Sequence, residues 1–380
     1  MTPIHGQCDD RLDALRKAFE AGFDERDELG AAVTVMIDGR VVADLWGGAA
    51  DPAGTRPWER DTLVNVWSTT KGVAALCAHT LADRGLLDLD APVAAYWPEF
   101  AAGGKAAITV RQLMAHRAGL SAPRTPTAQD ELYDWDLITA RLAASEPWWE
   151  PGTRSGYHIF TYGHLVGELV RRIDGRSIGA FLREEITGPR GIDFHIGLPA
   201  SEDHRVAELV PPPVLGESEL AVMFAQADPV AVATLTNPAP RPEQANTLAW
   251  RRAEIPSANG HGTARAVARL YGMAAGLDPE AGLSPSAVAR ARQGQGRCLD
   301  LVLGTALNQE TETCLGFWLS TDAAYGPNPD AFGHDGFGGS FGLADPENRV
   351  SMGYTMNRMG TQIANDPRKK ALIQAVYSSL

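Results

Sequence analysis

The hydrophobic pattern near both ends of the chain is typical of β-strands. Apolar and polar residues alternate on both sides of Asp38 and Gly39, a pair that favours a tight hairpin turn. The same alternation runs through residues 340–357, and residues 314–320 form a shorter apolar run. Because strands at the two ends of one chain can pair with each other, we predict an antiparallel sheet built from both termini.

Helical periodicity accounts for much of the remaining chain. Helices are expected near residues 9–23 and 366–379, next to the predicted strands. We therefore predict an α+β fold in which residues 1–85 and 251–380 form a sheet domain flanked by helices, and residues 86–250 form a mainly helical region.

The charge balance excludes several classes of function. The 380 residues include 34 basic and 47 acidic ones, a formal net charge of −13, and this excludes a nucleic-acid binder driven by bulk electrostatics.

No apolar run approaches the roughly 18 residues of a membrane span. The first residues lack an apolar core of signal-peptide length, so we expect a cytoplasmic location. The four cysteines lie far apart and are expected to be reduced thiols, without a metal site.

Lysine is rare in this chain, which has 29 arginines and five lysines. Lys17 falls on the exposed side of an amphipathic helix, and Lys105, Lys369 and Lys370 are interpreted as residues of polar or terminal segments. Lys71 differs, because it stands at the start of a segment that is apolar on every side.

Ser68 and Lys71 form the strongest candidate for chemistry. Residues 68–85 are predicted to form a buried helix, and positions i and i+3 share one face of a helix. Burial and the positive end of the helix dipole should both lower the pKa of Lys71. A serine beside a basic amine is the arrangement of an activated nucleophile, although a lysine that only caps the helix is an alternative.

Ser340 is a second candidate, because residues 338–342 match the G-x-S-x-G pattern of a nucleophile elbow. That elbow requires a strand before the serine and a helix after it. Here the residues after Ser340 alternate like a strand, so we interpret Ser340 as part of a glycine-rich strand entry.

Several sequence blocks resemble the serine β-lactamase-related superfamily, which includes class C β-lactamases, DD-peptidases and family VIII carboxylesterases. The blocks lie at residues 66–71, 85–93 and 108–120, with further matches near 151–167 and 331–357. The resemblance implies a β-lactamase/DD-peptidase-like fold with the active site in a cleft between the sheet domain and the helical region. Among these families the chain is most similar to family VIII carboxylesterases.

The resemblance assigns the second motif of the superfamily to Tyr157. Together with Lys71, this tyrosine would transfer the proton of Ser68, and near a cationic Lys71 it could exist partly as a phenolate. The asparagine that usually follows in this motif is replaced by Ile159. His158 is interpreted as a structural residue.

The third motif, usually K-T-G, corresponds to His334, Asp335 and Gly336. The resemblance implies an oxyanion hole made by the backbone N–H groups of Ser68 and Phe337. His334 and Gly336 would contact the substrate, but a histidine is a weaker anchor for a substrate carboxylate than a lysine.

These residues together favour a serine hydrolase that cleaves small carboxylic esters through an acyl-enzyme on Ser68, with no metal or organic cofactor. A small-amide or β-lactam hydrolase, an acyltransferase and a sensor that acylates without turnover remain alternatives. Trp148 and Trp149 are expected either to line the substrate pocket or simply to pack. The expected partner is a small-molecule ester, not a nucleic acid or a membrane, and the oligomeric state is open.

Overall fold

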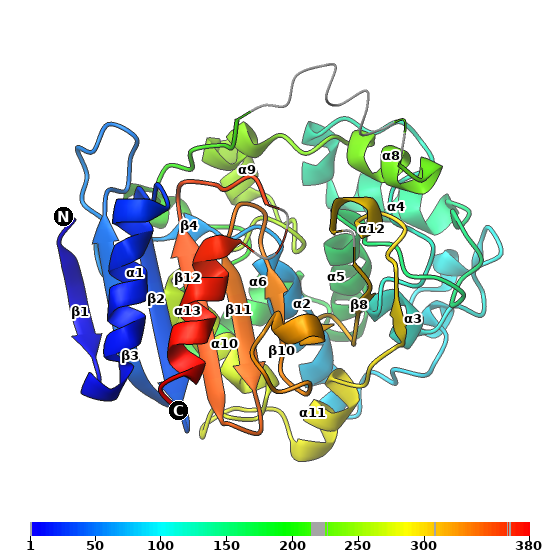
Figure 1. The fold of residues 1–380 in the computed structure, drawn as a ribbon. Helices are drawn as coiled ribbons and strands as arrows, with labels where there is room; N and C mark the ends of the chain where they lie inside the picture. Colours follow the sequence, from blue (N-terminus) through cyan, green and yellow to red (C-terminus); the bar gives the residue numbers. More distant parts are fainter. Residues whose placement is uncertain (1, 214–224, 226, 308, 363, 365) are drawn as a thin grey trace.

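A seven-stranded antiparallel sheet carries both ends of the chain (Figure 1). The structure is a computed structural model, and it describes residues 2–213, 225, 227–307, 309–362, 364 and 366–380. In spatial order the strands are β1 (Ile4–Cys8), β3 (Arg40–Gly48), β2 (Gly30–Ile37), β12 (Val350–Met356), β11 (Phe341–Asp345), β10 (Phe332–Asp335) and β9 (Trp318–Leu319). The predicted α+β class and the sheet built from both termini are confirmed.

The pairing of β2 with β12 joins the two ends of the chain, with Thr34 opposite Gly353. The predicted hairpin is also present, because Ile37 pairs with Arg40 across a turn in which Asp38 and Gly39 have φ of 51° and 72°. Strand β1 was not predicted, since its mostly exposed residues show no alternation. Strand β9 covers only Trp318 and Leu319 of the strand predicted at 314–320, because residues 315–317 form a bend.

Helices cover both faces of this sheet (Figure 1). The first helix α1 (Asp13–Glu25) and the last helix α13 (Pro367–Tyr377) pack against each other on one face. Helix α10 (Ala264–Ala274) packs on the other face, against β2, β11 and β12. The two terminal helices lie within a few residues of their predicted bounds.

Helix α2 (Thr69–Asp83) lies between the sheet and the helical part of the molecule, with contacts to α10, β10 and α5. Almost all of its side chains are buried, as its apolar composition predicted. It begins directly after Ser68, and Gly85 follows its end in the left-handed region, at φ 73°.

Most of the helical part lies on the right side of Figure 1. Its helices are α3 (Val110–Met114), α4 (Trp135–Ala144), α5 (Thr161–Asp174), α6 (Ile178–Phe181), α8 (Pro229–Thr236) and α9 (Leu248–Arg252). Two further short helices, α11 (Pro285–Ala291) and α12 (Gly304–Leu307), follow α10 in the chain. The boundaries at residues 85 and 250 stay a prediction.

Short strands form two small additional sheets. They are β4 (Val64–Asn65), β6 (His261–Gly262) and β5 (Phe194–His195) in one, and β7 (Arg297–Cys298) and β8 (Thr311–Glu312) in the other. Within the described ranges, no helix is long and apolar enough to span a membrane.

Candidate active site

Ser68 and Lys71 meet at the N-terminus of α2. The Nζ atom of Lys71 lies 3.0 Å from Oγ of Ser68, as the i, i+3 spacing predicted. Lys71 is fully buried, whereas Ser68 is partly exposed. The preceding residue, Trp67, has a φ of 47°, in the region that side chains larger than asparagine rarely adopt. This strained backbone brings Ser68 to the surface at the start of a buried helix.

Two neutral carbonyl groups surround the rest of the Lys71 amine. Nζ donates to the carbonyl oxygens of Ile159 at 2.8 Å and of Ser257 at 3.0 Å. Burial lowers the pKa of Lys71 well below its usual value of 10.5. The backbone of Ile159 thus contacts Lys71 at the position where the superfamily usually has an asparagine. A neutral amine at this place can accept a proton from Ser68.

Tyr157 lies on the other side of Lys71, with its ring centroid 4.7 Å from Nζ and its hydroxyl hydrogen-bonded to Ser68. Burial raises its pKa well above 10, and the carboxylates of Asp300 and Asp335 act in the same direction. The phenolate form expected from the sequence is therefore disfavoured. The expectation assumed a cationic Lys71, but burial disfavours the charged forms of both groups.

Two buried histidines support the loop that carries Tyr157. His158 Nδ1 lies 2.6 Å from the carbonyl oxygen of Gly156, and its Nε2 accepts from the N–H of Leu120. His116 Nδ1 accepts from the N–H of His158, and its ring lies 4.9 Å from that of Tyr157. Burial lowers the pKa of His158 to about 3. Its contacts agree with the structural interpretation.

The turn between β10 and β11 lies directly against the start of α2. A Cβ atom on Gly336 would be 2.3 Å from the carbonyl oxygen of Val66, so only glycine fits there. The ring of Phe337 contacts that of Trp67, with 5.8 Å between centroids. In the part of the chain that the structure describes, the N–H groups of Ser68 and Phe337 have no acceptor. Both residues are partly exposed, and both N–H groups are free to receive an oxyanion.

Ser340 braces this turn. Its side chain is buried, donates to the carbonyl oxygen of Val66 at 2.8 Å and lies 3.2 Å from the Thr69 hydroxyl. Strand β11 follows it, so the helix that a nucleophile elbow requires is absent at this point of the described chain. These contacts agree with the interpretation of Ser340 as a strand entry.

His334 is buried on β10 beside Tyr157, with 5.9 Å between the ring centroids. Its Nδ1 lies 2.8 Å from the carbonyl oxygen of Asp335, and no described residue is a partner for its Nε2. Burial lowers its pKa to about 3. His334 therefore presents a neutral imidazole.

Two of the lysines assigned to polar or terminal segments are in fact buried. Lys369 on α13 donates to the Asp335 carboxylate at 2.5 Å. Lys105 donates to three backbone carbonyls, those of Ala102, Ala143 and Ser145. The interpretation of these two residues was wrong, because packing against distant segments buries side chains that look exposed in sequence.

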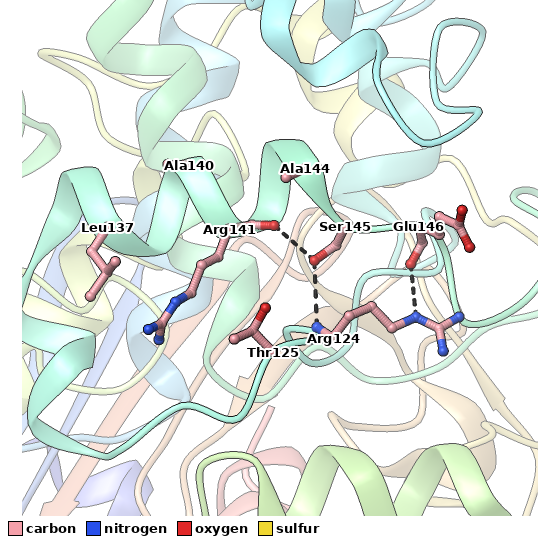
Figure 2. Close-up of a pocket in the computed structure, with 8 residues that line it drawn as sticks. All are labelled: Arg124, Thr125, Leu137, Ala140, Arg141, Ala144, Ser145 and Glu146. Atoms are coloured by element: carbon pink, nitrogen blue, oxygen red, sulfur yellow. Dashed lines mark hydrogen bonds between the residues drawn. The ribbon is translucent and has the colours of Figure 1, made fainter.

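The indoles of Trp148 and Trp149 each donate a hydrogen bond to a backbone carbonyl of the helical part. The indole of Trp148 donates to the carbonyl oxygen of Ala122 and stacks on Arg124, whereas Trp149 donates to the carbonyl oxygen of Arg154 and packs against His158. Figure 2 shows a pocket along α4, and Arg124, which stacks on Trp148, is one of the residues that line it. Its lining residues, which include Arg124 and Arg141, contain none of the predicted site residues.

An aromatic cluster lies at the turn between β10 and β11, called the oxyanion turn below because it carries the N–H of Phe337. Trp67 contacts Phe337 and Trp250, and Trp250 in turn contacts Tyr133 and Phe160. The position of Trp67 directly before Ser68 was the available signal for its role. Among the described residues, no group of three His, Cys, Asp or Glu side chains is placed to hold a metal ion.

Known proteins resemble this chain over its whole length. The model of the Beta-lactamase family matches residues 15–375. The esterase/beta-lactamase LipL of Mycobacterium tuberculosis is 38% identical over 94% of this chain and 83% of its own. A crystal structure of a family VIII carboxylesterase is 44% identical with a TM-score of 0.93, and a penicillin-binding protein homologue from Caulobacter crescentus is 44% identical with a TM-score of 0.88; both cover 100% of each chain.

These matches confirm the predicted superfamily, its fold and the similarity to family VIII carboxylesterases. They extend well beyond the short blocks around Ser68, Tyr157 and His334, because they include the sheet and the helical part alike. Together with the geometry at the start of α2, they show that the chain belongs to the beta-lactamase family of serine hydrolases.

Proposed function

We propose that the protein is a carboxylesterase that cleaves small esters through an acyl-enzyme on Ser68. The observation that carries this proposal is the buried Lys71 amine 3.0 Å from the Ser68 hydroxyl, where burial lowers the pKa of the amine. A buried neutral amine is the base that a serine needs in order to attack an ester carbonyl. The names of LipL and of the family VIII structure support the same reaction class.

In acylation, Lys71 takes the proton of Ser68 while Oγ attacks the ester carbonyl carbon. Two N–H bonds of the amine point to the carbonyls of Ile159 and Ser257, which leaves its lone pair for the Ser68 proton. The N–H groups of Ser68 and Phe337 hold the oxyanion, and each such donor stabilises the transition state by about 3 kcal/mol.

The attack forms a tetrahedral intermediate. Its collapse breaks the bond to the leaving alcohol, which receives a proton from the Tyr157 hydroxyl. Tyr157 recovers its proton from Lys71, so both groups return to their neutral forms. In deacylation, water takes the place of the alcohol and the same two groups move its proton. Ser68 is then released with a free carboxylic acid.

The surroundings favour neutral, apolar substrates. The partly exposed ring of Phe337 offers an apolar surface at the turn between β10 and β11, and it packs on the buried ring of Trp67. The neutral His334 offers a hydrogen-bonding nitrogen but no fixed cation for the carboxylate of a β-lactam. We therefore rank small esters above β-lactams and amides, and we retain a cytoplasmic location, which the four free thiols support.

A substrate panel tests this proposal. Wild-type protein and Ser68→Ala are compared on p-nitrophenyl esters, an anilide and nitrocefin, and intact mass is recorded after a short ester pulse. We expect ester turnover that is abolished in Ser68→Ala, with a transient acyl adduct on the wild type. Faster cleavage of the anilide would favour the amidase alternative. A permanent adduct would favour the sensor, and ester turnover by Ser68→Ala would exclude Ser68 as the nucleophile.

A further inference from the structure

The carboxylate of Asp300 is buried against the loop that carries Tyr157. Its side chain belongs to the segment before α12, outside every motif described above. Oδ1 accepts the N–H of Tyr157 at 2.9 Å, and Oδ2 accepts the hydroxyl of Ser155 at 3.0 Å. Asp300 thus holds the backbone of Tyr157 from a segment 143 residues away in the sequence.

The carboxylate is itself held in place. Oδ1 also accepts the N–H groups of Val302 and Leu303, at 2.9 Å and 3.0 Å. The N–H of Leu301 donates to the carbonyl oxygen of Ser155 at 2.9 Å, so the two segments are joined on both sides of Asp300. A carboxylate with this many donors has one orientation, and it transfers that orientation to Tyr157.

The charge of Asp300 also acts on the Tyr157 proton. The titratable and charged groups that interact with Tyr157 include Lys71, His116, His334, Asp300 and Asp335, together with the tyrosines Tyr162, Tyr271 and Tyr325. Burial disfavours the charged forms of the first three. The two carboxylates disfavour a second negative charge on the phenol, and Asp300 also accepts a hydrogen bond from the backbone N–H of Tyr157.

We propose that Asp300 is a positioning residue that holds Tyr157 as the proton donor to the leaving alcohol. This inference rests on the proposed esterase function, in which Tyr157 protonates the leaving group. It has a specific kinetic consequence. An alkoxide leaves poorly without a proton, whereas p-nitrophenolate leaves readily, so the role of Asp300 should depend on the leaving group.

The test compares kcat/KM for an ethyl ester and for the p-nitrophenyl ester of the same acid, because kcat/KM reports acylation. Asp300→Asn keeps the shape of the side chain and removes its charge. We expect its kcat/KM to fall about tenfold or more on the ethyl ester, the scale of a misplaced catalytic group. On the p-nitrophenyl ester the fall should be at most about threefold. Ser155→Ala, which removes one contact of Asp300, should lower kcat/KM for the ethyl ester more than for the p-nitrophenyl ester. This variant replaces Asp300→Asn in the test if Asp300→Asn does not fold.

A double-mutant cycle identifies the route of the effect. If Asp300 acts through Tyr157, Asp300→Asn should cause no further loss on the ethyl ester in a Tyr157→Phe background. The matched control is Asp345→Asn. Asp345 is also a buried carboxylate that holds a turn, through Asn328, Asn348 and Tyr377, but it lies at the end of β11 away from the oxyanion turn. Its variant should leave the ratio of the two esters unchanged.

Equal losses on both esters, or a full additional loss in the Tyr157→Phe background, would overturn the role of Asp300. The proposed function fails in a different way. If Ser68→Ala retains ester turnover, or if Tyr157→Phe cleaves the ethyl ester at the wild-type rate, the mechanism itself is wrong. The inference about Asp300 fails alone when those two variants are impaired as expected and Asp300→Asn behaves like the wild type.

Discussion

Replacing Lys71 by methionine should change how the stability of the protein depends on pH. Burial lowers the pKa of this amine well below its usual value in the folded protein, whereas the unfolded chain binds a proton up to a pKa of about 10.5. Because the unfolded state binds the extra proton, the free energy of unfolding of the wild type rises with pH between the lowered pKa of the folded state and 10.5. Lys71→Met has a similar length and no proton to lose, so it lacks this contribution.

The size of the effect follows from the structure. In that window the wild type should gain about 1.4 kcal/mol of stability for each pH unit relative to the variant. The variant also deprives the carbonyls of Ile159 and Ser257 of a donor, at a cost of about 1–3 kcal/mol each. The variant should therefore be the less stable protein near pH 10, and its disadvantage should shrink as the pH falls.

Urea unfolding at several pH values between 7.5 and 10 measures this difference directly. The buried histidines near Lys71 are neutral throughout this range, so they make the same contribution to the free energy of unfolding of the wild type and of the variant. Lys17→Met is the control, since Lys17 is exposed and its curve should run nearly parallel to that of the wild type. Parallel curves for Lys71→Met and the wild type would refute a neutral Lys71. The same variant should lose at least about 100-fold in kcat, the scale of a general base.

Two further substitutions test the oxyanion turn. Gly336→Ala should lower kcat by roughly 100-fold or more, because a Cβ atom 2.3 Å from the carbonyl oxygen of Val66 displaces the Phe337 N–H; ester kinetics on folded protein with near-normal kcat would show that the turn tolerates the displacement. Ser340→Ala should lower the free energy of unfolding by about 1–2 kcal/mol and keep most of the ester activity, because it removes the brace to Val66 and not the nucleophile. Thermal melts and the mass of the acyl adduct check this, and an acyl group mapped to Ser340 by peptide analysis would contradict it.

The parts of the site that follow from local spacing could be predicted from the sequence. Ser68 and Lys71 share one turn of a helix whose apolar composition alone indicated burial, and the β2–β3 hairpin follows from its turn residues. Tyr157 and Phe337 came from the superfamily resemblance, and the structure brings both to Ser68 or to the residue before it.

The remaining features depend on contacts between distant segments, which periodicity does not encode. Asp300 meets Tyr157 only after the helical part folds against the sheet, and Lys369 is buried only because α13 packs beside β10. The protonation state of Tyr157 was mispredicted for the same reason. Burial decides it, and the sequence around Tyr157 does not show how completely its ring is enclosed.

The brace between Thr69 and Ser340 has a consequence for synthesis of the chain. These residues are 271 positions apart, so the nucleophile leaves the ribosome long before the turn that completes its oxyanion hole. Strand β12, which joins the N-terminal strands to the rest of the sheet, emerges later still, and α13 is last. Until then the apolar helix α2 lacks its cover from the sheet and requires protection from aggregation. A nascent or truncated chain therefore carries Ser68 and Lys71 but no working hydrolase, and activity should begin only upon release of the full-length protein.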